Sequence, residues 1–444
     1  MPKYPLVVMK RAAFVVTASL VACRTTSPIL RLAAVPDSAL LLGDVQYLAS
    51  DALEGRGTGT AGNDSARAFI SRRLELLGLV PLADSAPSGS PRGRRSFVQS
   101  FAARMSGAER NGIPASLPTG NVAGLILGRD PLLRGQIVVL GAHLDHLGRR
   151  PFGARDPEAR DAIRNGADDN ASGVAAILEL ARLLRKSPPR RSVAILAFSA
   201  EELGLLGSDY LVNHPPFALD SVQAMLNFDM VGRLRDDRLM VYGTATAAEF
   251  PAIVADANSA PPFKLSAVGD GEGPSDHASF YRKGLPVLHF FTDVHDDYHK
   301  STDDADKINV DGMRRVVAYA ERITRALADR PARLTFVRAP VTAARAASAT
   351  RTGGPQPSLG TVPDMGASDV PGLRLGGISP GGAAEKAGLM PGDIVVELGG
   401  AAVTDLQSYS DALYSHKPGD EVNVVVLRGT TRLSLKVTLG RRGG

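Results

Sequence analysis

Four short apolar runs, each followed closely by histidine or carboxylate residues, dominate the first three quarters of the chain. They cover residues 136–140, 192–198, 223–228 and 285–291. Apolar runs of this length are typical of buried strands in a parallel sheet. Residues 171–186 and 310–328 instead carry apolar side chains at helical spacing. The pattern predicts an α/β fold with a mixed, mostly parallel sheet flanked by helices.

The polar residues after these runs are of the types that bind metal ions. They are His143 and Asp145 after the first run, Glu201 and Glu202 after the second, Asp229 after the third, and His299 in the loop after the fourth. The acidic stretch that contains Asp168 lies between the first two runs. In open α/β sheets, the loops at the carboxyl ends of parallel strands converge on ligands. Imidazole nitrogen and carboxylate oxygen without thiolate favour zinc, with cobalt or manganese as alternatives.

Each of these motifs has an ordinary structural explanation when it is taken alone. Ser199 and Glu202 have the spacing of a capping box at the start of a helix toward Tyr210. Residues 168–172 suit the loop and N-cap of the helix that follows them. The chain holds only eight histidines in 444 residues, so placement carries the signal rather than number. The motifs together, in this order, favour a metal site.

The combined pattern resembles the zinc-dependent exopeptidase family, which includes bacterial leucyl-type aminopeptidases, glutamate carboxypeptidase-like enzymes and, as a divergent branch, glutaminyl cyclases. The resemblance begins at residues 48–60 (LASDALEGRGTGT) and continues through the motifs above to residues 275–280 (SDHASF) and 306–308 (DKI). It covers most of residues 40 to 330. It implies a zinc exopeptidase fold and a di-zinc peptidase domain at residues 40–335.

The resemblance also implies a role for each motif residue. His143 and Asp229 would bind one zinc ion, Glu202 and His299 the other, and Asp168 would bridge the two. Glu201 would act as general base toward water and then as acid toward the leaving amine. Asp145 would accept a hydrogen bond from His143 and fix its tautomer, and Asp276 would serve His299 in the same way.

One departure from the family pattern concerns the oxyanion. Some relatives place a tyrosine shortly before the Ser-Asp-His triplet, whereas this chain has residues 269–274 (GDGEGP) there. The oxyanion donor is therefore unassigned, and Tyr298 and Tyr281 are the candidates.

The N-terminal residues have the pattern of an export signal. Lys3, Lys10 and Arg11 precede an apolar run at residues 12–22, which is too short to span a bilayer. The run ends in Leu-Val-Ala-Cys, which resembles the lipobox of bacterial lipoproteins, and Cys23 is the only cysteine of the chain. We therefore expect a signal peptide at residues 1–23 and a protein anchored to the membrane through lipidated Cys23. The expected location is the periplasmic face of the outer membrane, and a plain signal peptide on a periplasmic or secreted protein is the alternative.

The last quarter of the chain has a different composition. Residues 336–356 lack periodicity and are rich in Ala, Arg, Thr and Pro, which predicts a linker. Residues 357–442 contain short strand and turn patterns that resemble a PDZ domain of the bacterial protease type. Such domains bind an extended peptide at a sheet edge and capture its C-terminal carboxylate, here in a loop that includes Gly372 and Leu373. The alternative is a PDZ fold that acts as a lid or spacer.

Charge and composition exclude one class of partner. The chain has a net charge of +5 and a pI near 9.3. Its densest basic cluster, residues 92–95, lies in a Pro, Gly and Ser-rich stretch, and the chain has no tryptophan. Basic patches that bind nucleic acid need interleaved aromatic or groove-fitting residues, so we expect no nucleic-acid role.

The sequence therefore predicts a two-zinc exopeptidase that acts on peptide substrates, most simply an aminopeptidase, with a PDZ module. Three rivals stay open. A carboxypeptidase would need a cationic clamp for the substrate carboxylate, for which Arg233 is the candidate. A glutaminyl cyclase-like acyltransferase would keep one zinc ion. A non-catalytic, PDZ-centred peptide-binding lipoprotein would not need Glu201.

Overall fold

The computed structural model of the chain describes Met1 and residues 35–84, 95–105, 113–156, 158, 159, 161–259, 261–338, 357–363, 372–378, 381–404 and 406–441. The expected signal peptide with Cys23, residues 339–356 of the expected linker and residues 364–371 lie outside these described residues.

A nine-stranded sheet forms the centre of the larger part of the chain, in the order β1-β5-β7-β6-β8-β11-β9-β10, with β4 paired to β5. Its strands are β1 (Val80–Pro81), β4 (Val98–Ala103), β5 (Leu117–Ile126), β6 (Ile137–His143), β7 (Ser192–Phe198), β8 (Val222–Phe228), β9 (Arg238–Tyr242), β10 (Lys264–Ala267) and β11 (Val287–Phe291). β6 pairs in parallel with both β7 and β8, β8 with β11, and β9 with β10. β5 pairs antiparallel with β1, β4 and β7, and β9 pairs antiparallel with β11. The predicted mixed sheet is confirmed. A separate two-stranded pair joins β2 (Ala83–Asp84) to β3 (Arg95–Ser96).

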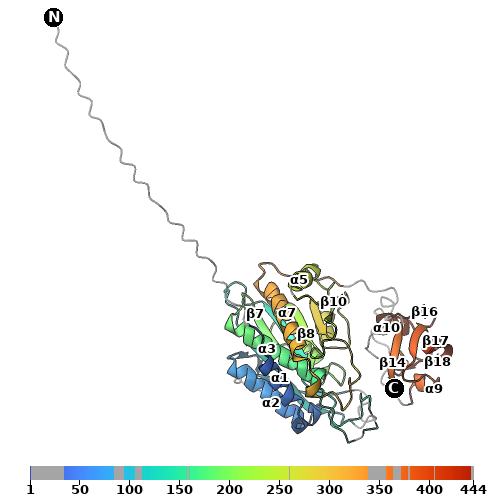
Figure 1. Cartoon of the computed structure of the whole chain (residues 1–444). Coiled ribbons are helices and arrows are strands. Elements are labelled where there is room, and N and C mark those ends of the chain that lie inside the picture. Colours follow the sequence, from blue (N-terminus) through green and yellow to red (C-terminus); the bar gives the residue numbers. More distant parts are fainter. Residues whose placement is uncertain are drawn as a thin grey trace. The chain divides into compact units, whose positions relative to one another are not determined.

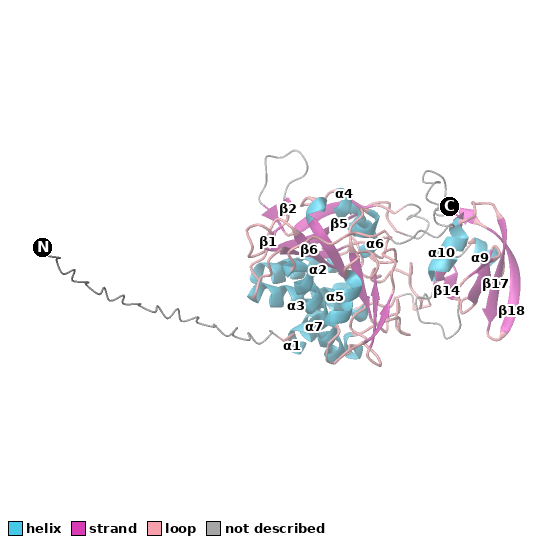
Figure 2. Ribbon diagram, turned by 90° about the horizontal axis from the view of Figure 1, so that it is seen from above, coloured by secondary structure: helices cyan, strands magenta, loops and turns pink. Residues whose placement is uncertain are grey.

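Helices cover both faces of this sheet, as Figure 1 and the view from above in Figure 2 show. One face carries α1 (Ser38–Leu48), α2 (Ala61–Leu76), α3 (Gly173–Lys186), α5 (Phe250–Ala257) and α7 (Val310–Asp329). The other face carries α4 (Leu206–Asn213) and α6 (His277–Arg282). Every residue of β6, β7 and β8 is buried, which explains why these strands are apolar throughout rather than alternating.

Two of the helices match the sequence pattern closely. α7 begins after Asn309, whose side chain accepts a hydrogen bond from the N–H of Gly312 and so caps the helix. α3 begins at Gly173, slightly later than the pattern predicts, because residues Ala167–Ser172 form an irregular turn in place of a first helical turn. That turn holds the acidic motif, so the departure from helical geometry matters for the site.

The C-terminal residues form a separate, small β-rich unit. Its elements are β12 (Pro357–Ser358), β13 (Thr361–Pro363), β14 (Leu373–Ile378), α9 (Ala383–Lys386), β15 (Ile394–Leu398), β16 (Ala401–Ala402), α10 (Leu406–Tyr414), β17 (Glu421–Arg428), β18 (Thr431–Thr438) and β19 (Gly440–Arg441). The main sheet has the order β13-β14-β15-β17-β18, with β16 paired to β15. Leu375, Val395, Leu398 and Val424 are fully buried in a core that belongs to this unit.

Only the end of the loop expected to capture a peptide carboxylate, Gly372 and Leu373, lies among the described residues. The N–H of Gly372 donates to the carbonyl of Thr404 at 3.0 Å. Leu373 is buried in β14, where it pairs with Val395. The N–H of Gly372 is thus used inside the domain, whereas residues 369–371 of the expected loop lie outside the described residues, so capture of a carboxylate there stays a prediction.

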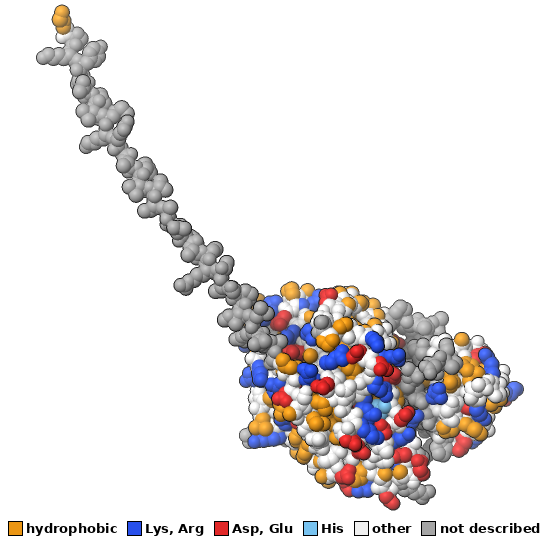
Figure 3. Space-filling view, viewed as in Figure 1, with side chains coloured by type: hydrophobic (Ala, Val, Ile, Leu, Met, Phe, Trp, Pro, Cys, Tyr) orange, Lys and Arg blue, Asp and Glu red, His pale blue; other side chains and the backbone are white. Residues whose placement is uncertain are grey.

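No helix among the described residues is both long enough and apolar enough to cross a membrane. Basic and acidic side chains are interspersed over the face of the protein in Figure 3.

Candidate metal centre

The site lies where parallel strands end side by side. β6 ends at His143, which pairs in register with Phe198, the last residue of β7. β8 lies on the other side of β6 and ends at Phe228, directly before Asp229. Three loops therefore leave the sheet at the same edge, as expected for the carboxyl ends of parallel strands.

The acidic turn before α3 sends its two aspartates in different directions. Asp169 has the non-helical angles φ −105° and ψ 89°, which turn its side chain away from that of Asp168. One oxygen of Asp169, Oδ1, lies 3.2 Å from Nε2 of His143. The other oxygen, Oδ2, lies 3.1 Å from Nε2 of His299 and 3.7 Å from Nδ1 of His146. The Asp169 carboxylate therefore lies between two groups of histidines.

Asp168 does not occupy the bridging position that the sequence comparison implied. Its Oδ1 accepts a hydrogen bond from the N–H of Gly232 at 2.7 Å, and its Oδ2 lies 3.2 Å from Nε2 of His295. Of the two aspartates, Asp169 is the one whose carboxylate oxygens lie beside His143 and His299. We therefore replace Asp168 with Asp169 as the candidate shared ligand.

Two clusters of candidate ligands share Asp169. The first joins His143, Asp169 and Asp229, with Nε2 of His143 3.3 Å from Oδ1 of Asp229. The second joins His146, Asp169 and Glu202, and Nε2 of His299 lies 3.3 Å from Oε2 of Glu202. Within each cluster, one ligand atom from each of the three residues lies within 4.8 Å of the others. Buried nitrogen and oxygen donors at this spacing fit two divalent ions of the zinc type.

His146 is the residue that sequence reasoning passed over. Its Nδ1 donates to Oε1 of Glu202 at 2.7 Å, and its side chain is buried. The signal was present, because His146 follows His143 by three residues in a chain with few histidines.

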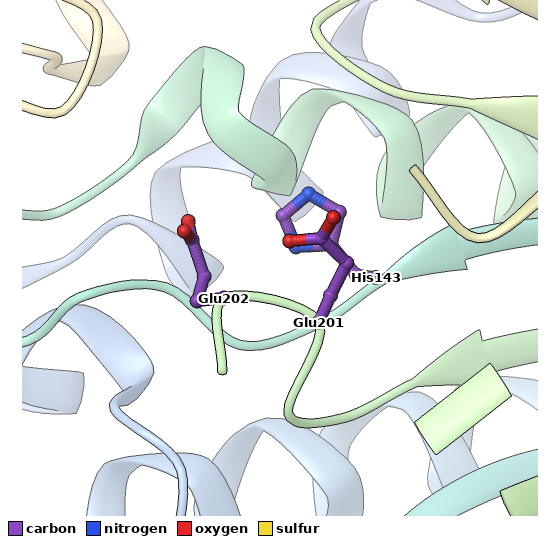
Figure 4. Close-up of side chains that lie close together, drawn as sticks. All are labelled: His143, Glu201 and Glu202. Atoms are coloured by element: carbon purple, nitrogen blue, oxygen red, sulfur yellow. The ribbon is translucent and has the colours of Figure 1, made fainter. Parts of the chain in front are cut away.

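Glu201 and Glu202 lie on one tight turn after β7 and point to different parts of the site (Figure 4). Ala200 has φ +61°, and α4 begins only at Leu206, so the turn is not the capping box that the Ser199 spacing also allowed. Glu201 reaches the side of His143, where these two residues and Glu202 form a third compact group.

The two glutamates differ in their protonation. Burial, together with the neighbouring carboxylates of Glu202, Asp276 and Asp229, raises the pKa of Glu201 well above its usual range, although His143 opposes this shift. Burial also opposes ionisation of Glu202, but His299 and His146 hold its pKa at about 2. One carboxyl is therefore suited to holding a proton and the other to staying ionised.

Asp145 acts on different atoms from those expected. Nδ1 of His143 lies 3.1 Å from the backbone carbonyl oxygen of Asp145 rather than from its carboxylate. The carboxylate instead accepts the N–H of Glu201 at 3.1 Å through Oδ1. Asp145 thus connects the loop after β6 to the turn after β7.

Asp276 is not the partner of His299. Nδ1 of His299 hydrogen-bonds the carbonyl oxygen of Gly153 at 2.8 Å. Asp276 is buried close to Glu201 and Asp229 on the other side of the site, and burial raises its pKa to about 7. The sequence assignment failed because the residues that support His299 come from the long loop after β6.

Comparison with known proteins agrees with this arrangement. Residues 121–324, which include all the candidate ligands, match the sequence profile of peptidase family M28, and residues 363–439 match that of the PDZ domain. The chain carries a peptidase family M28 domain and a PDZ domain. The M28 match is 36% identical over 152 residues to leupeptin-inactivating enzyme 1 of Streptomyces exfoliatus, covering 33% of this chain and 34% of that enzyme. It is 29% identical over 160 residues to aminopeptidase YwaD of Bacillus subtilis, covering 34% of this chain and 35% of that protein.

Solved structures show that the fold is shared more widely than the sequence. A zinc aminopeptidase from Bacillus subtilis has a TM-score of 0.51 at 17% identity, covering 68% of this chain and 98% of that one. A glutaminyl cyclase from Bacteroides thetaiotaomicron has a TM-score of 0.53 at 17% identity, covering 66% of this chain and 99% of that one. The chain spans about a third of the length of the curated relatives it matches, so the fold and the M28 domain are shared features, and the activity must be argued from the site.

Proposed function

We propose that the M28 domain is a two-zinc aminopeptidase. The observation that carries the proposal is the placement of the Asp169 carboxylate between two histidine–carboxylate clusters, with Glu201 beside them. The M28 match and the aminopeptidase among its relatives support the same activity.

Five side chains would hold the two ions. His143 and Asp229 would bind one, Glu202 and His299 the other, and Asp169 would give one oxygen to each. Zinc bound there would polarise the substrate carbonyl and lower the pKa of water toward neutrality. His146 would orient Glu202 through their hydrogen bond.

Glu201 is the proposed general base. It lies on the same turn as Glu202, beside His143, but is not needed as a ligand, so its carboxylate is available to accept a proton and later return it. It would take a proton from the attacking water and give it to the leaving amine. Asp145 holds the backbone of Glu201 in place for this step.

Tyr298 is the proposed donor to the carbonyl oxygen of the substrate. Its ring stacks on His299 with the ring centres 3.9 Å apart. Burial, and the carboxylates of Asp169 and Glu202, raise the pKa of its phenol, so the hydroxyl keeps its proton. The other candidate, Tyr281, is buried against Phe336, which suits a packing role.

The carboxypeptidase alternative is weakened by the contacts of Arg233. Its Nη2 donates to Oδ2 of Asp297 at 3.2 Å, which ties the loop after β8 to the loop that carries His299. A guanidinium used in this way is less suited to clamp the carboxylate of a substrate.

The proposal is tested with matched peptides that have a free or an acetylated N-terminus. We expect release of the first residue from free peptides only, and loss of activity after chelation that zinc restores. Equal cleavage of both peptides would reject the aminopeptidase assignment, and release from the C-terminus would favour a carboxypeptidase. Conversion of N-terminal glutamine to pyroglutamate by protein with one zinc per chain would favour the cyclase.

We also propose that the protein is exported and anchored through lipidated Cys23, on the basis of the Leu-Val-Ala-Cys sequence. Cell fractionation of Cys23→Ser tests this. The variant should move from the membrane to the soluble fraction, and continued membrane association would argue against the anchor.

For the PDZ domain we propose binding of an extended peptide by strand addition, which the domain match supports. Fluorescent peptides with a free or an amidated C-terminus test this on the full chain. Binding that requires the free carboxylate is expected, and no binding would favour a spacer role.

A further inference from the structure

A segment far from the metal ligands in the sequence lies directly against them. Residues Asp51–Arg56 form an irregular helical turn, and the segment continues to Thr60, where α2 begins. These residues belong to the motif at 48–60, whose function the ligand set does not explain.

Arg56 anchors this segment. Its guanidinium is buried, and its hydrogen bonds to described residues go to the backbone carbonyls of Leu48, Leu144, Asn165 and Gly166. Leu144 follows His143, and Gly166 precedes the turn that carries Asp169. Burial lowers the pKa of Arg56 to about 10, so it stays cationic at neutral pH. A fixed guanidinium with this many carbonyl partners holds the segment in one place relative to both ligand loops.

Thr58 extends from this anchored segment to the base. Its hydroxyl donates to Oδ2 of Asp145 at 2.8 Å, and both side chains are buried. Oδ1 of the same carboxylate accepts the N–H of Glu201 at 3.1 Å. The two oxygens of Asp145 are therefore each held by one donor, and the Thr58 hydroxyl fixes the rotation of the carboxylate that holds Glu201.

The turn of Glu201 needs this support. Ala200 has a positive φ, which non-glycine residues adopt only where surrounding contacts offset its cost. Loss of the Thr58 hydroxyl would leave a buried carboxylate oxygen unpaired and free the carboxylate to rotate. The Glu201 backbone would then lose a defined position.

We propose that Thr58 is a positioning residue for the base Glu201, acting through Asp145 from a segment that Arg56 anchors. The inference rests on the proposed function, because it takes Glu201 as the base. Thr58 is a positioning residue and not a catalytic one in this proposal, since its hydroxyl acts on Glu201 through Asp145.

The test compares Thr58→Val, which keeps the shape and removes the hydroxyl, with Thr58→Ser, which restores the hydroxyl. Full-length Thr58→Val should bind the same zinc per chain as the parent, with kcat about 10-fold lower and KM within about 2-fold, as is typical for loss of an outer hydrogen-bond partner. Thr58→Ser should recover most of kcat. Parent-level kcat in Thr58→Val, or no recovery in Thr58→Ser, would overturn the proposal.

Thr60→Val is the matched control. The Thr60 hydroxyl caps α2 by accepting from the N–H of Asn63, and it donates to the carbonyl of Gly57. This variant should lower the melting temperature and leave kcat unchanged. A fall in kcat as large as that of Thr58→Val would show that the loss reflects general weakening of the segment. Should Thr58→Val not fold, Thr58→Ala and Thr58→Ser differ by the hydroxyl oxygen alone and give the same comparison.

Amide hydrogen exchange separates this inference from the proposed function. If the parent does not release N-terminal residues, the aminopeptidase assignment fails, but exchange in residues 199–202 still reports the hydrogen bond of Glu201. Thr58→Val should exchange faster there than the parent and Thr60→Val should not. Unchanged exchange in Thr58→Val would contradict the positioning role whatever the activity.

Discussion

Two turns of the M28 domain each carry a pair of adjacent acids, and the two acids of a pair are placed differently in the two turns. In the first turn, Asp169 lies between the histidines, while Asp168 faces away toward Gly232 and His295. In the second, Glu202 meets His146 and His299, while Glu201 lies beside His143 with a raised pKa. Asp168 therefore stabilises the surrounding loops through Gly232 and His295, whereas Glu201 lies inside the site, where it could transfer a proton. In both turns the second acid meets the histidines, and the backbone of each turn decides whether the first acid also lies in the site.

The largest expected effects concern Glu201 and Glu202, whose replacement should change turnover and zinc content in different ways. Glu201→Gln should retain two zinc ions and lose at least about 100-fold in kcat, because a general base contributes that much or more. Glu202→Gln should lose zinc as well, since an amide is a poorer ligand than a carboxylate. Metal analysis with steady-state kinetics checks both variants. Near-parent turnover in Glu201→Gln would remove it as the base.

Replacement of Asp169 should reduce zinc binding much more than replacement of Asp168. Asp169→Asn should lose zinc from both positions, because its two oxygens face different clusters. Asp168→Asn should keep both ions and weaken zinc binding by about 10-fold, as expected when a supporting residue outside the ligand set changes. Competition with a coloured chelator measures both affinities. The opposite order would restore Asp168 as the shared ligand.

The two histidines beside Glu202, His146 and His299, should differ in how strongly their replacement reduces zinc binding. His299→Ala should lose one of the two zinc ions, whereas His146→Gln should retain both with affinity reduced by about 10-fold, because His146 orients Glu202 rather than binding metal in this account. Zinc per chain after dialysis checks this. Loss of one ion in His146→Gln would make it a ligand.

A carboxylate outside both turns shows what burial does without histidines. Burial raises the pKa of Asp44 from 3.8 to about 6, against the opposing effect of Arg73. The folded protein therefore binds the proton of the Asp44 carboxyl more tightly than the unfolded chain does. The stability that the protonated Asp44 adds is fully present below pH 3.8 and is lost as the pH rises toward 6.

An asparagine at position 44 does not ionise, so Asp44→Asn should not lose stability over this pH range as the parent does. The free energy of unfolding of Asp44→Asn relative to the parent should rise between pH 4 and pH 7 by no more than about 3 kcal/mol. Urea unfolding at the two pH values measures it. A constant difference would show that the ion pair with Arg73 offsets the burial.

The strand ends could be predicted from sequence because fully buried parallel strands are apolar throughout, and the residues that follow them must share one edge of the sheet. The same reasoning could not choose between Asp168 and Asp169, because both are acidic, adjacent and buried, and only the non-helical angles of Asp169 decide.

Contacts between segments that are distant in the sequence could not be predicted either. The hydrogen-bond partner of His299 is the backbone carbonyl of Gly153. Because every residue has a backbone carbonyl, the residue type at this position does not reveal the contact. The sequence also could not show that the N–H of Gly372 binds the carbonyl of Thr404, because a glycine before a strand looks the same in sequence whether its N–H is open to a ligand or used inside the domain.

The most direct test of the two-zinc centre is a crystal structure of the full chain with zinc, using anomalous scattering to locate the ions. Two anomalous peaks are expected on opposite sides of Asp169, each about 2.0–2.2 Å from one of its carboxylate oxygens. A single peak, or a peak held by Asp168 instead of Asp169, would contradict the account.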